Sequence, residues 1–102
     1  MAVRSVGVLE PVLTSTIGDS GTATIAMAGE FPDTYIYLNT HINVREIVML
    51  TRMGTTLRED PIYRSSSVTS SFSLSSNAAL TITGAGNCRG MLYLLRQAKK
   101  PS

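Results

Sequence analysis

Two side chains in this sequence have the types that a nucleophilic catalytic pair requires, the single cysteine and the single histidine. Cys88 could act as a nucleophile if His41 lay close enough to take its proton. Nothing in the spacing brings the two together, and any protein with one residue of each type meets the same criterion. We interpret Cys88 as a small apolar core residue, and we expect His41 in a partly exposed turn with Asn39 and Thr40.

The adjacent acids Glu59 and Asp60 are a second candidate for chemistry, as an acid/base pair. Neighbouring side chains on an extended chain point to opposite faces, so these two would not share a site. Together with Arg58 and Pro61 they are expected to form a charged, solvated loop. A metal site needs three or four suitable ligands at set spacings, and no such pattern is present. We therefore expect no catalytic residue, no metal and no cofactor.

Three glycines follow a predicted strand, at Gly84, Gly86 and Gly90. A phosphate-binding loop also follows a strand, but this spacing matches neither the dinucleotide nor the Walker pattern. Bulky apolar residues come next, where a phosphate loop would open a capped helix. We interpret the segment as a hairpin loop whose glycines allow positive φ.

Residues 65–83 give the clearest information about the fold, because two kinds of side chain alternate along them. The apolar set occupies even positions, at Val68, Phe72, Leu74, Leu80 and Ile82. The hydroxyl set occupies odd positions, at Thr69, Ser71, Ser73, Ser75, Thr81 and Thr83. A period of two places the sets on opposite faces of a strand, and residues 75–78 have turn-forming side chains. The pattern predicts a β-hairpin with one apolar face and one hydroxyl face.

The rest of the chain is predicted to form further short strands. They are expected within residues 3–17, 22–28, 34–38 and 88–97, with Pro11 interrupting the first and turns or loops at 18–21, 29–33, 58–61 and 84–87. About eight strands separated by such turns predict an all-β domain, a small antiparallel β-sandwich or barrel.

Residues 44–53 are ambiguous. Asn43 with Glu46 fits a helix capping box, and Gly54 fits a helix stop. Against a helix, several residues here are β-branched and the run 47–50 is apolar on every side, as in a strand buried on both faces. We favour a strand and keep a possible short helix at 44–53 as the alternative.

Length and composition place the chain among small folded domains. The 102 residues predict a single β domain, 1–102, with an N-terminal arm at 1–5 and a basic C-terminal tail at 96–102. One cysteine argues against a disulfide framework. There is no apolar run like that of a signal peptide. There is also no apolar run of roughly 20 residues, the length that crosses a bilayer. We expect a protein that is not secreted and does not enter a membrane.

The charges are few and unevenly placed. Charged residues make up 16% of the chain and the net charge is +2, so copies repel each other weakly, which favours an assembled state. Residues 1–60 have four arginines against seven acids, whereas residues 61–102 have five basic residues and no acid. This asymmetry fits chance in a small protein, complementarity between copies, or an acidic partner. The candidate partner-contact residues are Arg64, Arg89, Arg96, Lys99, Lys100, Ser71, Ser73 and Ser75.

Binding of single-stranded nucleic acid is the functional alternative that these residues raise. Arginines at 64, 89 and 96 could line a sheet on which Tyr35, Tyr63 or Tyr93 stacks bases. Binders of this kind usually have a larger basic excess. The preference for arginine over lysine fits a protein interface equally well.

In size, low charge, Ser/Thr/Gly-rich strands and lack of any export signal or site, the chain resembles small all-β virion proteins of tailed bacteriophages. These are capsid cement or decoration proteins and tail components. The resemblance implies a non-enzymatic structural protein of the virus particle, made in the host cytoplasm. It would form a homo-oligomer and bridge subunits of another capsid protein through strand edges, the hydroxyl face and the basic tail. The alternatives are a tail or head–tail connector component, or a small β-barrel that binds single-stranded nucleic acid.

Overall fold

The computed structural model describes residues 7–26, 33–76 and 79–97, and these residues form eight β-strands and no helix. Every pairing between strands is antiparallel. The strands are β1 (Gly7–Pro11), β2 (Thr22–Ala26), β3 (Asp33–Thr40), β4 (Arg45–Met53), β5 (Thr56–Arg64), β6 (Ser71–Leu74), β7 (Ala79–Thr83) and β8 (Gly90–Gln97). The prediction of an all-β domain of about eight short strands is confirmed.

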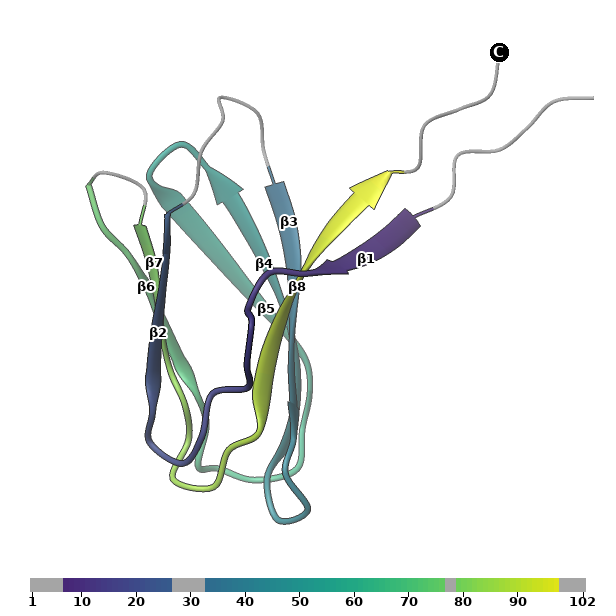
Figure 1. The fold of residues 1–102 in the computed structure, drawn as a ribbon, viewed down its shortest axis with the longest axis vertical. Coiled ribbons are helices and arrows are strands. Elements are labelled where there is room, and N and C mark those ends of the chain that lie inside the picture. Colours follow the sequence, from purple (N-terminus) through teal and green to yellow (C-terminus); the bar gives the residue numbers. More distant parts are fainter. Residues whose placement is uncertain (1–6, 27–32, 77–78, 98–102) are drawn as a thin grey trace, which may run out of the picture.

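The strands form two sheets that face each other (Figure 1). One sheet has five strands in the order β1-β8-β3-β4-β5, and the other has three in the order β2-β7-β6. In the described part of the chain no ladder joins an edge of one sheet to an edge of the other. The architecture is therefore a β-sandwich, and the alternative of a closed barrel is wrong.

The outer ends of β1 and β8 extend beyond the sandwich as a two-stranded ribbon, at the upper right of Figure 1. Gly7 pairs with Gln97 at its tip. Residues 1–5 of the predicted arm and 98–102 of the predicted basic tail lie outside the described residues. The ribbon places the first and last described residues side by side.

The predicted hairpin is present as β6 and β7, with Phe72 opposite Ile82 and Ser73 opposite Thr81. Ile82 is fully buried and Ser73 is exposed, so the two faces have the predicted character. Residues 68 and 69 precede β6 instead of extending it. Of the predicted turn at 75–78, residues 77–78 lie outside the described residues.

Residues 44–53 do not form a helix, and the alternative of a short helix there is wrong. Residues 45–53 form β4, which lies between β3 and β5 and pairs with both. Ladders on two edges satisfy the backbone along the whole segment, and its β-branched residues suit this conformation. Buried and partly exposed residues alternate along β4, and Val48 and Leu50 face the core.

The prediction of a charged loop at 58–61 is also wrong, because these residues lie within β5. β5 is the edge strand of its sheet, where proline is tolerated because one side of the strand needs no ladder hydrogen bond. The register shifts here, since Ile47 pairs with Tyr63 while Val48 pairs with Pro61. A bulge, a proline and charged side chains protect an exposed edge against further pairing.

Several other boundaries differ from the prediction. In residues 3–17 only Gly7–Pro11 form a strand, and Ile17 makes an isolated bridge to Gly90. β3 is longer than predicted and includes Asn39 and Thr40, so the turn begins at His41. Residues 27–32, which hold the end of one predicted strand and most of one predicted loop, lie outside the described residues. The last strand begins at Gly90 and not at 88.

The core lies between the two sheets. Tyr37, Leu50 and Leu92 from the large sheet and Leu80 and Ile82 from the small sheet are fully buried. Alternate residues of each strand enter this layer, as the pleat of a strand requires. The core holds the two sheets at a fixed distance and turns their opposite faces outward.

Candidate interaction surface

The face of the five-stranded sheet that points away from the small sheet is apolar, and no strand of the described residues covers it. We call it the outer face. The register places its side chains in three rows across the sheet. The rows are Tyr93, Ile36 and Met49, ending in Asp60 on β5; Met91, Leu38, Ile47 and Tyr63; and Leu9, Leu95, Thr34 and Thr51, ending in Arg58 on β5.

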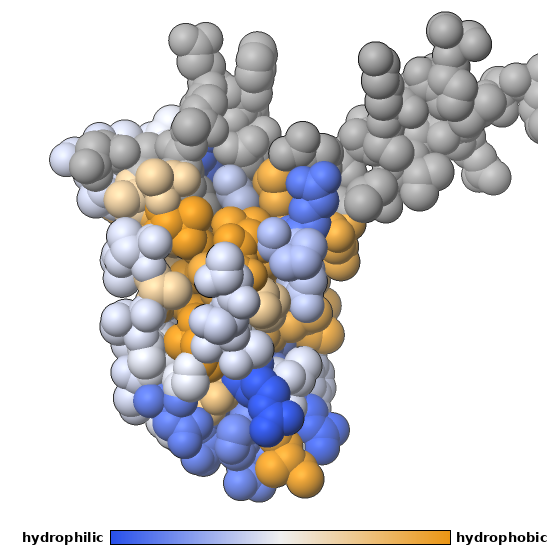
Figure 2. All heavy atoms as spheres, viewed as in Figure 1, coloured by the Kyte–Doolittle hydropathy of each residue, from blue (hydrophilic) through white to orange (hydrophobic). Residues whose placement is uncertain are grey.

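The side chains of the outer face are partly exposed. Tyr63 is 49% exposed, Leu9 47% and Leu95 38%, whereas Ile36 and Met49 in the middle of the sheet are half-buried by their neighbours. In Figure 2 orange spheres run along the flank that lies opposite the three-stranded sheet. Single exposed apolar residues are normal, but a continuous patch of this kind marks a contact surface.

A signal for this face is present in the sequence. The three central strands are apolar at both odd and even positions, as Ile36 beside Tyr37 and Met49 beside Leu50 show. Strands with two apolar faces are typical of sheets that are covered on both sides. The small sheet covers one side, and no strand of the described residues covers the second apolar set.

The outward face of the three-stranded sheet has the opposite character. Thr83 lies between Thr22 and Ser71, and Thr81 lies between Thr24 and Ser73. The Oγ1 atoms of Thr24 and Thr81 are 3.3 Å apart. The predicted hydroxyl face is thus confirmed, and β2 extends it by a strand. Pale, weakly polar spheres mark this side in Figure 2.

A buried polar cluster at one end of the sandwich was missed by the sequence prediction, and Glu46 is its centre. The Glu46 side chain is fully buried. Its carboxylate accepts hydrogen bonds from the Ser70 backbone N–H (2.9 Å), the Ser70 hydroxyl (2.7 Å) and the Asn39 amide (3.1 Å). Arg64 Nε completes the set at 3.3 Å. A buried carboxylate is tolerated only with such partners.

The hydrogen bonds around Ser70 have one consistent direction. Because Ser70 donates to the carboxylate, its oxygen must accept from Tyr37 OH at 2.8 Å, and it also accepts from the Ala85 N–H at 3.1 Å. The Tyr37 oxygen then accepts from the Cys88 thiol at 3.2 Å. Burial, which disfavours the charged phenolate, raises the pKa of Tyr37 well above its usual value of 10.

Asn39 connects the same cluster to two loops. Its oxygen accepts from the backbone N–H groups of His41 (3.1 Å) and Arg89 (2.9 Å), and its Nδ2 donates to the Asn87 carbonyl as well as to Glu46. The cluster therefore joins β3, β4 and the loop that precedes β8. A charged residue at position 46, on the apolar face of its strand, was the available sequence signal.

The predicted contact residues do not lie on one surface. Arg64 points inward to Glu46, and Arg89 is exposed in the loop before β8. Ser71 and Ser73 lie on the hydroxyl face, while Ser75 Oγ accepts the Ala79 N–H at the end of β6. Arg96 lies in β8 opposite Val8, far along the strand from Arg89. Lys99 and Lys100 lie outside the described residues.

The aromatic residues proposed as stacking platforms are separated as well. Tyr35 is buried in the core, whereas Tyr93 and Tyr63 lie on the outer face. β3 and β4 lie between the strands of these two tyrosines, a separation of about 14 Å at the usual strand spacing. The arginines at 64 and 89 do not share this face.

The residues considered for catalysis have structural partners. Cys88 is buried and bonds Tyr37, and its N–H donates to Asp19 Oδ1 at 2.8 Å. His41 Nδ1 accepts the Asn43 N–H at 3.0 Å. Glu59 and Asp60 lie on the edge strand β5. No three His, Cys, Asp or Glu side chains of the described ranges are grouped so that they could hold a metal ion.

The glycine segment is not a hairpin loop, because β7 and β8 belong to different sheets. Nor do its glycines adopt positive φ; among the described glycines only Gly54 does, in the turn between β4 and β5. Gly84 and Gly90 are needed for close packing instead, whereas a Cβ on Gly86 would meet nothing within 4 Å. A Cβ on Gly84 would lie 2.8 Å from Cys88 Sγ.

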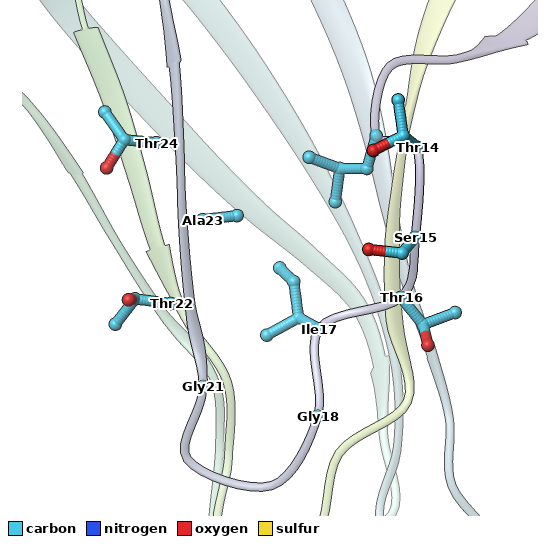
Figure 3. Close-up of a pocket in the computed structure, with 10 residues that line it drawn as sticks. Thr14, Ser15, Thr16, Ile17, Gly18, Gly21, Thr22, Ala23 and Thr24 are labelled. Atoms are coloured by element: carbon cyan, nitrogen blue, oxygen red, sulfur yellow. The ribbon is translucent and has the colours of Figure 1, made fainter.

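Two surface cavities lined by described residues are candidate sites. One, of about 310 Å³, lies between β2 and residues 13–18, where Ala23 and Ile17 point toward each other across the gap (Figure 3). Its ten lining residues include no ionisable side chain. The other, of about 260 Å³, is a shallow hollow that includes Leu38, Ile47 and Tyr63 of the outer face. Neither cavity gathers the groups that a catalytic site requires.

None of the described residues forms a helix with the length and hydropathy to span a bilayer. No protein-family model matches this chain, and comparison with curated proteins and with solved structures finds none that is significantly similar to it.

Proposed function

We propose that this chain is a non-enzymatic structural protein of a virus particle, which self-associates and bridges capsid subunits as a cement or decoration protein. The observation that carries the proposal is the outer face, where nine apolar side chains stand in three rows with no described strand over them. Exposing an apolar surface of this extent to water is unfavourable for a free monomer. In an assembly the same surface can be buried in a contact.

The placement of the ionisable groups supports a structural role. Glu46 forms a salt bridge with Arg64, and Cys88 forms a hydrogen bond with Tyr37. These groups therefore stabilise the sandwich. The larger cavity is lined by hydroxyl and apolar groups. Chemistry at a site needs titratable groups aimed into a cavity, whereas assembly needs rigid surfaces.

Bridging between subunits requires more than one contact surface, and the sandwich offers others besides the outer face. β2 and β6 are the edges of the small sheet, and neither contains a proline or a charged residue. Edges of this type accept a further strand from another chain. Each joint stabilises a shell because a partner that binds only the folded state shifts the folding equilibrium.

The viral context of the proposal rests on the resemblance in size, low charge and Ser/Thr-rich strands. This viral context can be tested directly by identifying the genes that lie beside this reading frame. Genes for capsid, portal or tail proteins are the expected neighbours. A location among metabolic genes would contradict the virion part of the proposal and leave the assembling role intact.

Sedimentation velocity across a range of concentrations tests the assembling role. The chain has a mass of 10.9 kDa, and we expect species at multiples of this mass in the micromolar range. A single monomeric species at every concentration, together with no binding to any larger particle, would contradict the proposal.

A further inference from the structure

We infer that the outer face is the surface where two copies of this chain meet, sheet face against sheet face, with β3 of one copy over β3 of the other. The inference rests on the proposed function and names the partner at this face. The result is a stack of four sheets, in which the two large sheets are central and the two hydroxyl faces point outward.

The size of the outer face reaches the lower limit for a specific pair. Five strands at a spacing of about 4.8 Å, with about six residues of rise, give a flat footprint of roughly 500 Å². Two such faces bury roughly 1,000 Å², the amount that a specific interface needs, before the corrugation of the side chains is counted. A contiguous apolar patch of this area lies in the upper part of the range for the largest patch on a monomer, and such patches often mark contact sites.

The chemistry of the outer face favours an equally apolar and uncharged partner surface. On β8, β3 and β4 the three rows contain no charged side chain. The charges lie at the margin, where Arg58 and Asp60 on β5 form an ion pair with each other at 3.0 Å. A charged partner surface would lose its hydration over these rows without gaining an opposite charge.

Among the described surfaces of this protein, the outer face itself is the one with the complementary character. The hydroxyl face consists of small side chains such as Thr81 and Ser73, and cannot fill the spaces between large apolar ones. On the outer face, the hollow beside Leu38, Ile47 and Tyr63, which Arg45 also lines, gives room for an aliphatic side chain of the facing sheet. A surface that matches itself is typical of two-fold dimers.

The order of the strands determines what lies at the centre of such a pair. β3 is the third of five strands, so a two-fold axis that superposes the two faces places β3 over the partner's β3. Ile36 and Leu38 are the outward side chains in the middle of that strand. The contact is closed, because each outer face is used once.

Site-specific cross-linking of the full chain tests this arrangement. Packed sheets lie about 10 Å apart, which is too far for most disulfides, so a short bis-maleimide is the suitable reagent. Ile36→Cys is expected to shift from the monomer band of 10.9 kDa to a covalent dimer of twice that mass. The wild-type chain is the first control, because Cys88 is its one cysteine and is buried.

Ser73→Cys is the matched control, since it places an exposed cysteine on the hydroxyl face, and it is expected to stay monomeric. Cross-linking of Ser73→Cys, whether alone or equally with Ile36→Cys, would overturn the inference. Sedimentation of both variants reports whether copies still associate. Association without cross-linking at Ile36 contradicts the face-to-face pair and leaves the assembling role intact. Monomers throughout contradict both.

Discussion

The ring of Tyr37 lies directly against Gly90, in the space that a side chain at position 90 would occupy. A Cβ built on Gly90 would lie 2.9 Å from both Cε1 and Cζ of the ring, which is closer than such atoms approach. Tyr37 lies in β3 and Gly90 begins β8, the next strand in the sheet. This fit allows the hydroxyl of Tyr37 to reach Ser70 and Cys88.

We therefore expect Gly90→Ala to lower the free energy of unfolding by about 1–3 kcal/mol, the usual effect of overpacking in a close-packed core. Gly86→Ala, in the loop that precedes β8, is the matched control. A Cβ there meets nothing within 4 Å, and we expect a change within about 0.5 kcal/mol. Urea unfolding of the two variants measures the difference. Equal effects would mean that Tyr37 moves aside at little cost.

The carboxylate of Glu46 is expected to be essential for stability. Glu46→Ala leaves donors from Ser70 and Asn39 without their acceptor inside the protein. We expect a loss of about 2–4 kcal/mol in the free energy of unfolding, because each unsatisfied buried donor has its own cost. Glu59→Ala on the exposed edge strand is the control. Thermal or urea unfolding that ranks the two variants equally would contradict a structural role for the cluster.

The raised pKa of Tyr37 predicts lower stability in alkali. The unfolded chain releases the Tyr37 proton near pH 10, whereas the folded chain retains it to higher pH. Above pH 10 the unfolded state therefore binds fewer protons, and the free energy of unfolding falls as the pH rises. Tyr37→Phe is expected to remove up to about 1.4 kcal/mol per pH unit from this slope.

Urea unfolding at several pH values from 9 to 12 measures that slope. Tyr63→Phe, at a half-exposed ring on the outer face, is the matched control and is expected to retain the wild-type slope. A slope that is the same in all three proteins would show that the Tyr37 hydroxyl does not govern the alkaline transition.

A charge in the outer face is expected to disrupt assembly without unfolding the chain. Met49→Lys places an ammonium group between Ile36 and Asp60 on the outer face, and we expect at least about tenfold weaker self-association. Ser73→Lys, on the hydroxyl face, is the matched control with the same added charge. Sedimentation measures association, and urea unfolding confirms that both variants fold. If Ser73→Lys weakens assembly more than Met49→Lys, the copies meet through the hydroxyl face.

An assembling protein of this type is not expected to bind single-stranded nucleic acid. Fluorescence titration with short oligonucleotides at two salt concentrations measures this. Tight binding that weakens steeply with salt would indicate phosphate contacts and would favour the small nucleic-acid-binding domain instead.

Much of the fold followed from local patterns. The alternation along residues 71–74 and 79–83 predicted both the strands and their two faces, because a strand directs successive side chains to opposite sides. The charged segment at 58–61 was mispredicted, because its composition suits a loop and an exposed edge strand alike. Only the position of β5 at the edge of its sheet distinguishes the two.

The sequence by itself determined that this chain is an antiparallel all-β domain with a hydroxyl face and with strands apolar on both sides. Only the tertiary structure decided which apolar face is enclosed. Tyr37 and Ile36 are both apolar, so the periodicity of the sequence does not tell which of them faces the core. The tertiary structure likewise decided that Glu46, Ser70 and Cys88 share one buried cluster. Residues so far apart in the chain come into contact only because the two sheets pack against each other. A local sequence pattern contains no information about that packing.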